Sequence, residues 1–224
     1  MHAPFALYVH FPWCRHVCPY CDFNVYALAR PPQTTFIATL VAELARWADA
    51  PEWRGRSVKS LYLGGGTPSL FSAESIGTLL LAIGATCGLT PGAEVTLEAN
   101  PGTMTAEQLG ALHAIGVNRL SLGAQAFQPA LLRTLGRDHT GSDTQTAMVA
   151  ARAAGFTNVS LDLIFAVPGQ SLDVWTADLD AALALHPDHL SAYALTYEPG
   201  TPFHGWRQSG RLRALRARGT TGAS

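Results

Sequence analysis

Charged side chains are scarce in this sequence. Only 14% of its 224 residues are charged, and 15 basic residues against 16 acidic ones leave a formal net charge of -1. A chain with no excess of basic residues lacks the electrostatic footprint of a protein that binds nucleic acid or an anionic membrane. We therefore expect neither of those partners.

Long hydrophobic runs are also missing, because no apolar segment reaches the roughly 20 residues of a transmembrane helix. The start, MHAPFALYVHFPWC, lacks the basic region, the long apolar region and the small-residue cleavage site of a signal peptide. These absences predict no transmembrane segment and a cytoplasmic location. Hydrophobic residues make up 48% of the chain, which suffices for the core of one large domain or two small ones.

Cysteine is rare as well, yet three of the four cysteines fall within eight residues. Cys14, Cys18 and Cys21 occupy the stretch CRHVCPYCDF with CxxxCxxC spacing. Pro12 and Pro19 disfavour a helix there, so a loop can fold three thiolates around one centre. In a reducing compartment, clustered cysteines are more often metal ligands or redox groups than disulfides.

Two metal centres fit this spacing. A zinc site requires a fourth ligand, which His10 or His16 could supply. A cubane iron–sulfur cluster needs one thiolate per iron, so three cysteines leave one iron open for another ligand. Cys87 follows an apolar helical segment, and we expect it to be a small buried hydrophobe.

Six short apolar segments, rich in Val, Leu and Ile, predict buried strands at residues 6–11, 58–63, 94–99, 118–123, 158–165 and 189–197. Segments with helical spacing alternate with them, at residues 34–48, 73–85, 105–115, 129–135, 143–154 and 172–185. This alternation predicts the α/β class with a parallel sheet, either doubly wound or curled into an open barrel.

Each of the first five predicted strands carries polar residues near its carboxyl end or leads into them. The first strand leads into the cysteines and the second into GGGTPS, and the next three carry Glu98 and Asn100, Gln125, and Asp162. Ligand sites in parallel α/β folds lie at the carboxyl ends of strands. We therefore expect these residues to converge on one site, as they would in an open barrel.

Several motifs together resemble a known family: YVHFPWCRHVCPYCDF, YLGGGTPSLF, EVTLEANPGT, RLSLGAQAFQPALLRTLGRDH, VSLDLIFAVPGQS and LSAYALTYEPGTPF. Over residues 5 to about 203 the chain resembles the radical S-adenosylmethionine (SAM) proteins. Within them it is similar to the oxygen-independent coproporphyrinogen III oxidase group and its haem-chaperone branch. The resemblance implies a six-stranded partial (β/α) barrel that holds a [4Fe-4S] cluster on Cys14, Cys18 and Cys21, with SAM on the open iron.

The same resemblance implies a SAM site made of Tyr8, Tyr20, Gly64, Gly65, Gly66, Thr67, Glu98, Gln125, Arg137 and Asp162. Each has a plainer interpretation outside that context. Tyr8 could be an aromatic residue of a buried strand, Glu98 a solvated loop acid, and Arg137 a surface cation. A phosphate loop is a weak alternative for the glycines, since no GK[ST] follows them.

The residues around the last cysteine indicate the branch. CPYCDFN is similar to the haem chaperones, whereas the oxidases carry a further Gly and Cys after the motif. We therefore expect a protein that transfers haem to an acceptor protein, and keep coproporphyrinogen oxidation as the alternative. The resemblance assigns no catalytic residue, and the sequence does not indicate an oligomeric state.

The last residues break the pattern of the barrel, because no acidic residue follows Glu198 while arginines accumulate. We expect a radical SAM barrel over residues 1–203 and an Arg-rich tail over residues 204–224 that is disordered or aberrant, with a basic interaction arm as the alternative. Nothing after Phe203 resembles the carboxyl-terminal domain of the family, so we expect that domain, and with it tight haem binding, to be absent.

Overall fold

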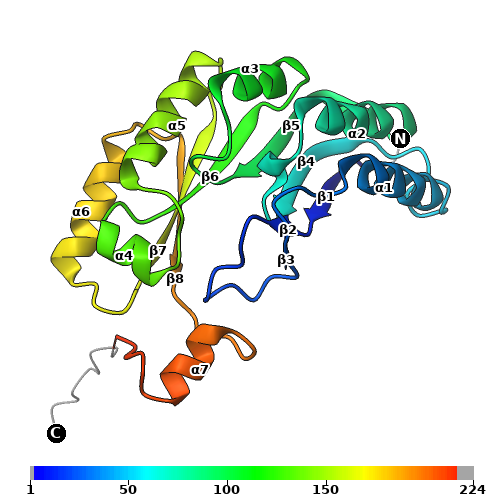
Figure 1. Cartoon of the computed structure of the whole chain (residues 1–224). Coiled ribbons are helices and arrows are strands. Elements are labelled where there is room, and N and C mark those ends of the chain that lie inside the picture. Colours follow the sequence, from blue (N-terminus) through cyan, green and yellow to red (C-terminus); the bar gives the residue numbers. More distant parts are fainter. Residues whose placement is uncertain (1–2, 216–224) are drawn as a thin grey trace, which may run out of the picture.

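The computed structural model describes residues 3–215, and its centre is a curved parallel sheet (Figure 1). The six strands lie in the order β1-β4-β5-β6-β7-β8, and every neighbouring pair is parallel. Their bounds are β1 Phe5–Phe11, β4 Val58–Gly65, β5 Leu89–Ala99, β6 Arg119–Gln125, β7 Val159–Phe165 and β8 His189–Ala194. The predicted α/β class and all six predicted strands are confirmed.

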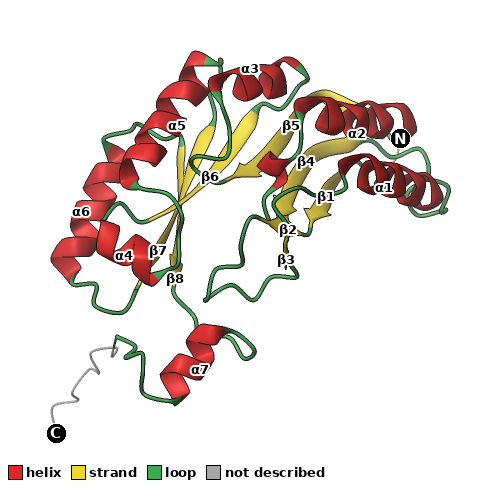
Figure 2. Ribbon diagram, viewed as in Figure 1, coloured by secondary structure: helices red, strands yellow, loops and turns green. Residues whose placement is uncertain are grey.

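Helices line the outer side of the curved sheet (Figure 2). They are α1 Gln33–Ala48, α2 Ala73–Thr86, α3 Ala106–Ala114, α4 Pro129–Thr134, α5 Gly141–Ala153 and α6 Leu172–Leu183, with a short 3-10 helix η1 at Pro68–Leu70. Helix α3 begins with a capping box, because Thr105 and Gln108 exchange side-chain to backbone hydrogen bonds. All six predicted helices are found within two residues of their expected ends.

Strand alternation divides the apolar and polar side chains between the two faces of the sheet. Alternate strand residues such as Leu61, Leu97 and Leu161 are buried in a single core with α1, α2, α3, α5 and α6. The intervening positions carry Glu98 and Asp162, which line a cavity on the inner side. The outer face therefore stabilises the fold, and the inner face is free to form a site.

Two short strands close the base of the cysteine loop, and the sequence pattern did not predict them. β2 (Trp13–Cys14) pairs with β3 (Tyr26–Ala27). The N–H of Tyr26 donates to the carbonyl of Pro12 at 2.7 Å, and that of Leu28 to the carbonyl of Cys14 at 2.8 Å. Residues 15–25 therefore form a closed loop whose two ends are fixed to the barrel.

Helix α7 (Pro202–Gln208) runs across residue 203, where we expect the barrel to end and the Arg-rich tail to begin. Arg207 stacks on Tyr197 at 4.9 Å and Arg211 on Trp206 at 4.6 Å from the ring centres. Arginines that cover aromatic rings remain compatible with a folded segment, so their number did not indicate disorder. The predictions for residues 216–224, which include two of the arginines, lie outside the described residues.

Across residues 3–215, none of the helices combines the length and the hydropathy that a membrane crossing requires.

Candidate functional site

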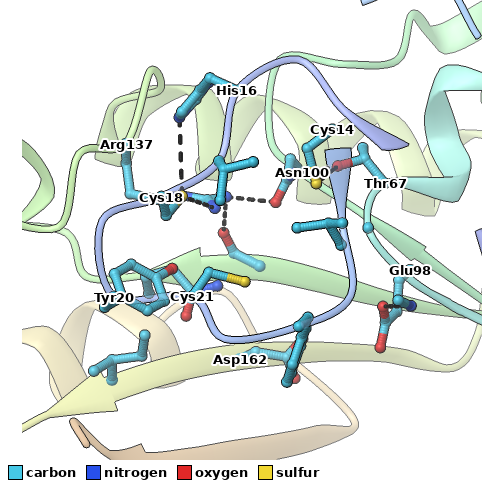
Figure 3. A pocket seen from close by; sticks show the side chains of 18 of the residues that line it. Cys14, His16, Cys18, Tyr20, Cys21, Thr67, Glu98, Asn100, Arg137 and Asp162 are labelled. Carbon is cyan, nitrogen blue, oxygen red and sulfur yellow. Dashed lines mark hydrogen bonds between the residues drawn. The ribbon is translucent and has the colours of Figure 1, made fainter. Parts of the chain in front are cut away.

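A cavity of about 450 Å³ lies at the carboxyl ends of the strands, between the sheet and the cysteine loop. Cys14, Cys18 and Cys21 all line it, and all are free thiols (Figure 3). Cys87 lies elsewhere, at the carboxyl end of α2, where it packs against the core. The structure thus separates the three clustered cysteines from the fourth.

The three thiols surround the cavity without meeting at one point. Within residues 3–215, no three His, Cys, Asp or Glu side chains are gathered closely enough to hold a metal ion. Burial raises the pKa of the Cys14 and Cys21 thiols, so a bound metal would have to displace their protons. Three free thiols on one loop, all lining one cavity, nevertheless form the donor set that an iron–sulfur centre with three protein ligands requires.

The two histidines considered as zinc ligands are engaged in hydrogen bonds. His10 Nε2 donates to the carbonyl of Asn24 at 2.8 Å, and its Nδ1 lies 3.1 Å from the Tyr8 hydroxyl. His16 Nε2 donates to the carbonyl of Gly136 at 2.9 Å. A ring nitrogen that donates to a carbonyl has no lone pair for a metal. Each contact engages one nitrogen of its ring and fixes the ring orientation, and histidines that bind a metal through the other nitrogen make the same kind of contact.

Glu98, at the end of β5, is held by donors from β4. Its carboxylate accepts hydrogen bonds from the Tyr62 hydroxyl at 2.8 Å and from the Gly65 N–H at 2.9 Å. Burial raises the pKa of Glu98, and these two hydrogen bonds oppose that rise. Glu98 is therefore a fixed, partly desolvated carboxylate, unlike the solvated loop acid of its plainer interpretation.

Asp162, on β7, lies on the same inner face. The Ser121 hydroxyl lies 3.1 and 3.0 Å from its two carboxylate oxygens. Burial raises the pKa of Asp162 as well, and the hydrogen bond from Ser121 lowers it in part. Two partly buried carboxylates from different strands thus line one cavity.

Gln125, at the end of β6, also lines the cavity, and it has a left-handed backbone with φ of 62°. Ala166, one residue after β7, has φ of 61°. Non-glycine residues rarely adopt this conformation, and such positions cluster at functional sites. Two neighbouring strands therefore end in strained turns beside the cavity.

The glycines at the carboxyl end of β4 are required by close packing within the protein. A Cβ on Gly65 would lie 2.5 Å from the His10 ring, and one on Gly66 would lie 2.5 Å from the carbonyl of Trp13. Gly65, Gly66 and the buried Thr67 line the cavity, whereas Gly64 is buried next to Tyr62. The β2 segment packs so closely here that a side chain would not fit, which is one physical reason for the GGGTPS motif.

The two predicted aromatic residues occupy different places. Tyr20 lines the cavity and packs edge to face on Phe203, with ring centres 6.1 Å apart. Tyr8 is 54% exposed and lines a separate apolar groove beside β1, stacked 6.0 Å from Tyr62. Tyr8 therefore lies behind Tyr62 instead of lining the cavity itself.

Arg137, which follows α4, reaches the cavity through three hydrogen bonds. It donates to Cys18 Sγ at 3.5 Å, to the Gly123 carbonyl at 3.0 Å and to the Asn100 amide oxygen. The plainer interpretation of a surface cation is therefore wrong. Its side chain contacts a cysteine of the loop directly.

Neither Tyr62 nor Ser121 was predicted from the sequence, and Asn100 was predicted only as a strand-end residue. The alternation of side chains along a strand offered a signal, because residues two apart face the same side of the sheet. Tyr62 lies two residues before Gly64, and it pairs across the sheet with Thr96, which lies two residues before Glu98. Ser121 pairs directly with Glu98. Neighbouring inward positions of this kind are identifiable only once the register is known.

A curved six-stranded parallel sheet with a three-cysteine loop over its strand ends defines an α/β partial barrel with a candidate cluster site. The family profile described as the radical SAM superfamily matches residues 8–181, which is most of the chain. The chain therefore belongs to the radical SAM superfamily.

Within that superfamily, the chain is similar to proteins named heme chaperone HemW. It is 42% identical to the protein from Escherichia coli K12 over 201 residues, covering 89% of this chain and 53% of the relative. It is 42% identical to the one from Mycobacterium tuberculosis over 218 residues, covering 94% and 54%. The chain spans about half the length of the curated relatives it matches.

Among solved structures, the chain is similar to coproporphyrinogen III oxidase (HemN) from Escherichia coli, described as a radical SAM enzyme. The TM-score is 0.79 at 30% identity, and the match covers 94% of this chain and 48% of that one. The partial-barrel prediction is thereby confirmed.

Proposed function

We propose that the chain holds a [4Fe-4S] cluster on Cys14, Cys18 and Cys21 and binds SAM beside it. The observation that supports this most is that the three free cysteines line the same cavity as polar side chains from successive strand ends. When bound, such a cluster supplies the electron that cleaves a carbon–sulfur bond of the SAM sulfonium. The barrel contributes binding, orientation and exclusion of water.

The carboxylates Glu98 and Asp162 suit the ammonium group and the ribose hydroxyls of SAM. Both lose solvation by burial, as their raised pKa values indicate, so each gains from a cationic or hydroxyl donor. Gln125 offers an amide at the same wall. Gly65 and Gly66, with the hydroxyl of Thr67, leave the backbone open to the methionine portion.

Arg137 suits the SAM carboxylate. A guanidinium has five N–H groups. The two N–H groups on Nη2 donate to Asn100 and Gly123, and one of the two N–H groups on Nη1 donates to Cys18. The second N–H of Nη1 is left for a ligand carboxylate. Tyr20 lines the same cavity as Arg137. Tyr8 stacks on Tyr62 and Gly64 lies next to it, so both contribute to the proposed SAM site indirectly, by holding the Tyr62 ring in place.

For the biological role we propose haem transfer to an acceptor protein in the cytoplasm, where free thiols persist. The similarity to HemW proteins and the CPYCDFN sequence support this role. The alternative is oxidative decarboxylation of a porphyrinogen in porphyrin biosynthesis, which the similarity to HemN supports. Haem is cargo in the first case, and a porphyrinogen is substrate in the second.

Anaerobic reconstitution with iron and sulfide tests the shared part of this proposal. We expect about four irons per chain and cleavage of SAM after reduction with dithionite, the iron count following from the cluster type. A reconstituted chain that retains no iron would overturn the cluster assignment. Spectral titration with haem, compared with anaerobic carbon dioxide release from coproporphyrinogen, then separates haem transfer from oxidation.

A further inference from the structure

Two of the three cysteine thiols are joined by a continuous chain of hydrogen bonds through the barrel wall. Thr67 Oγ1 donates to Cys14 Sγ at 3.4 Å, and the Asn100 amide donates to Thr67 Oγ1 at 3.0 Å. Arg137 donates to the Asn100 amide oxygen and, through its other terminal nitrogen, to Cys18 Sγ at 3.5 Å. Figure 3 shows these side chains along one wall of the cavity.

The chemistry of the donors fixes the direction of every bond in this chain. A guanidinium only donates, so the oxygen of the Asn100 amide must face Arg137 and its NH₂ group must face Thr67. Because the Thr67 hydroxyl accepts from Asn100, its single hydrogen points to Cys14. All of the donors therefore run from one cation toward two sulfurs.

Among the described residues, no carboxylate forms an ion pair with Arg137 and neutralises its charge. Among residues 3–215, the basic side chains in close contact with a carboxylate are His16, beside Asp138, and Arg152, beside Asp188, and Arg137 is not one of them. Its Nε is buried without a hydrogen-bond partner. A guanidinium in this position is stabilised by an anion nearby, and Cys18 is the ionisable group that it touches.

The surrounding residues hold this chain in one arrangement. Thr67 is 2% exposed, and its backbone N–H donates to the carbonyl of Trp13 at 2.8 Å. A Cβ on Gly123 would lie 2.9 Å from the Asn100 amide oxygen and 3.5 Å from Arg137 Nη2. Glycine at position 123 thus leaves the space in which Asn100 and Arg137 meet.

We propose that Arg137, Asn100 and Thr67 form a relay that places hydrogen-bond donors on the Cys14 and Cys18 thiolates of the bound cluster and raises its reduction potential. Asn100 and Thr67 are positioning residues in this relay. This proposal rests on the proposed cluster function. It goes further, because it assigns to the residues behind the cysteine ligands an effect on the reduction potential of the cluster. Hydrogen bonds to cluster sulfurs stabilise the reduced, more negative state, so their loss makes reduction harder.

Thr67→Val removes the hydroxyl and keeps the shape of the side chain, while Thr67→Ser keeps the hydroxyl. Asn100→Leu has a similar size, adds no charge and removes both the acceptor for Arg137 and the donor to Thr67, so it tests the relay at a second position. Ser69→Ala is the matched control, because Ser69 is buried nearby and its hydroxyl pairs with that of Thr103 at 2.8 Å. Each reconstituted protein is titrated with dithionite under argon and followed by electron paramagnetic resonance.

We expect Thr67→Val and Asn100→Leu to hold the parental amount of iron and to be reduced at a more negative potential than the parent. Thr67→Ser and Ser69→Ala should keep the parental potential. A full cluster with an unchanged potential in Thr67→Val, or in Asn100→Leu if the first variant fails to fold, would overturn the relay alone. A parent chain without any iron–sulfur signal would instead overturn the proposed function on which the relay rests.

Discussion

The backbone N–H of Phe203 donates a hydrogen bond to the carbonyl of Pro19 at 3.0 Å. This bond joins the start of α7 to the middle of the cysteine loop, between Cys18 and Cys21. The Phe203 ring is fully buried, and it packs against Tyr20 and Trp206. The segment after β8 therefore fixes the loop that carries the candidate ligands.

This packing predicts a large effect of Phe203→Ala. Removing a fully buried phenylalanine costs about 3 to 5 kcal/mol of unfolding free energy, through lost burial and the cavity left behind. Denaturant unfolding measures that loss. Phe23→Ala, in the same loop but 63% exposed, should stay within about 0.5 kcal/mol of the parent. Equal losses for both variants would show that α7 does not pack on the loop.

A second contact to the loop predicts that Gly136 cannot be replaced. Its φ is +68°, and a Cβ there would lie 2.6 Å from Cδ of Pro19. Gly92 has a similar φ of +73° with open space around its Cβ position, so Gly92→Ala measures the backbone strain alone, about 1 to 2 kcal/mol. Gly136→Ala should lower the thermal midpoint further and should reduce iron retention after reconstitution. Equal midpoints for the two variants would contradict the clash with Pro19.

The ligand assignment predicts an asymmetry among the cysteines. Replacing Cys14, Cys18 or Cys21 by Ala should abolish the broad absorbance near roughly 400 nm that thiolate-bound iron–sulfur clusters give. Cys87→Ala should keep the full absorbance, because Cys87 lies outside the cavity. A complete cluster in the Cys14→Ala variant would contradict the assignment.

The polar wall of the cavity predicts a role for Glu98 in SAM binding. Loss of a charge-assisted hydrogen bond costs about 1.5 to 3 kcal/mol, which corresponds to a weakening of roughly tenfold or more. Glu98→Gln should show that loss in calorimetric titration with SAM at unchanged iron content. Glu94→Gln, on the exposed part of β5, is the control and should bind as the parent does. Parental affinity of the Glu98 variant would remove this residue from the site.

The strands and helices were predictable because their signals are local. Runs of Val, Leu and Ile mark β4 and β7, and the pair Thr105 and Gln108 marks the start of α3. The convergence of polar residues at strand ends followed from the parallel topology alone. These features depend on residues close together in the chain or on a general rule of α/β folds.

The rest depends on contacts between distant residues. Asn100 meets Arg137 across 37 positions of sequence, and Phe203 meets Pro19 across a still longer separation. Strands β2 and β3 have two residues each, too few for any periodicity. The α7 segment appeared aberrant because its arginines were counted as free charge, whereas Arg207 and Arg211 cover aromatic rings.

Burial of Asp162 predicts a dependence of stability on pH. Burial raises its pKa above the ordinary 3.8, although Ser121 donates to it, so the folded protein holds that proton more tightly than the unfolded chain does. The stability that this proton contributes is complete below the unfolded pKa and is lost as pH rises through the folded pKa. Asp162→Asn cannot lose a proton, and its amide oxygen still accepts from Ser121.

In the metal-free protein, the unfolding free energy of Asp162→Asn minus that of the parent should therefore increase from about pH 4 toward neutrality. Asp143→Asn is the control, because its difference in unfolding free energy from the parent should change with pH in the opposite direction. Its hydrogen bonds from Thr140 hold the pKa of Asp143 below the ordinary value, so the parent should be the more stable protein at neutral pH, and the gap should close on acidification. Urea unfolding at several pH values measures both differences. The same pH dependence in the parent and in Asp162→Asn would show that Asp162 is solvated in the folded protein, and the raised pKa would then be wrong.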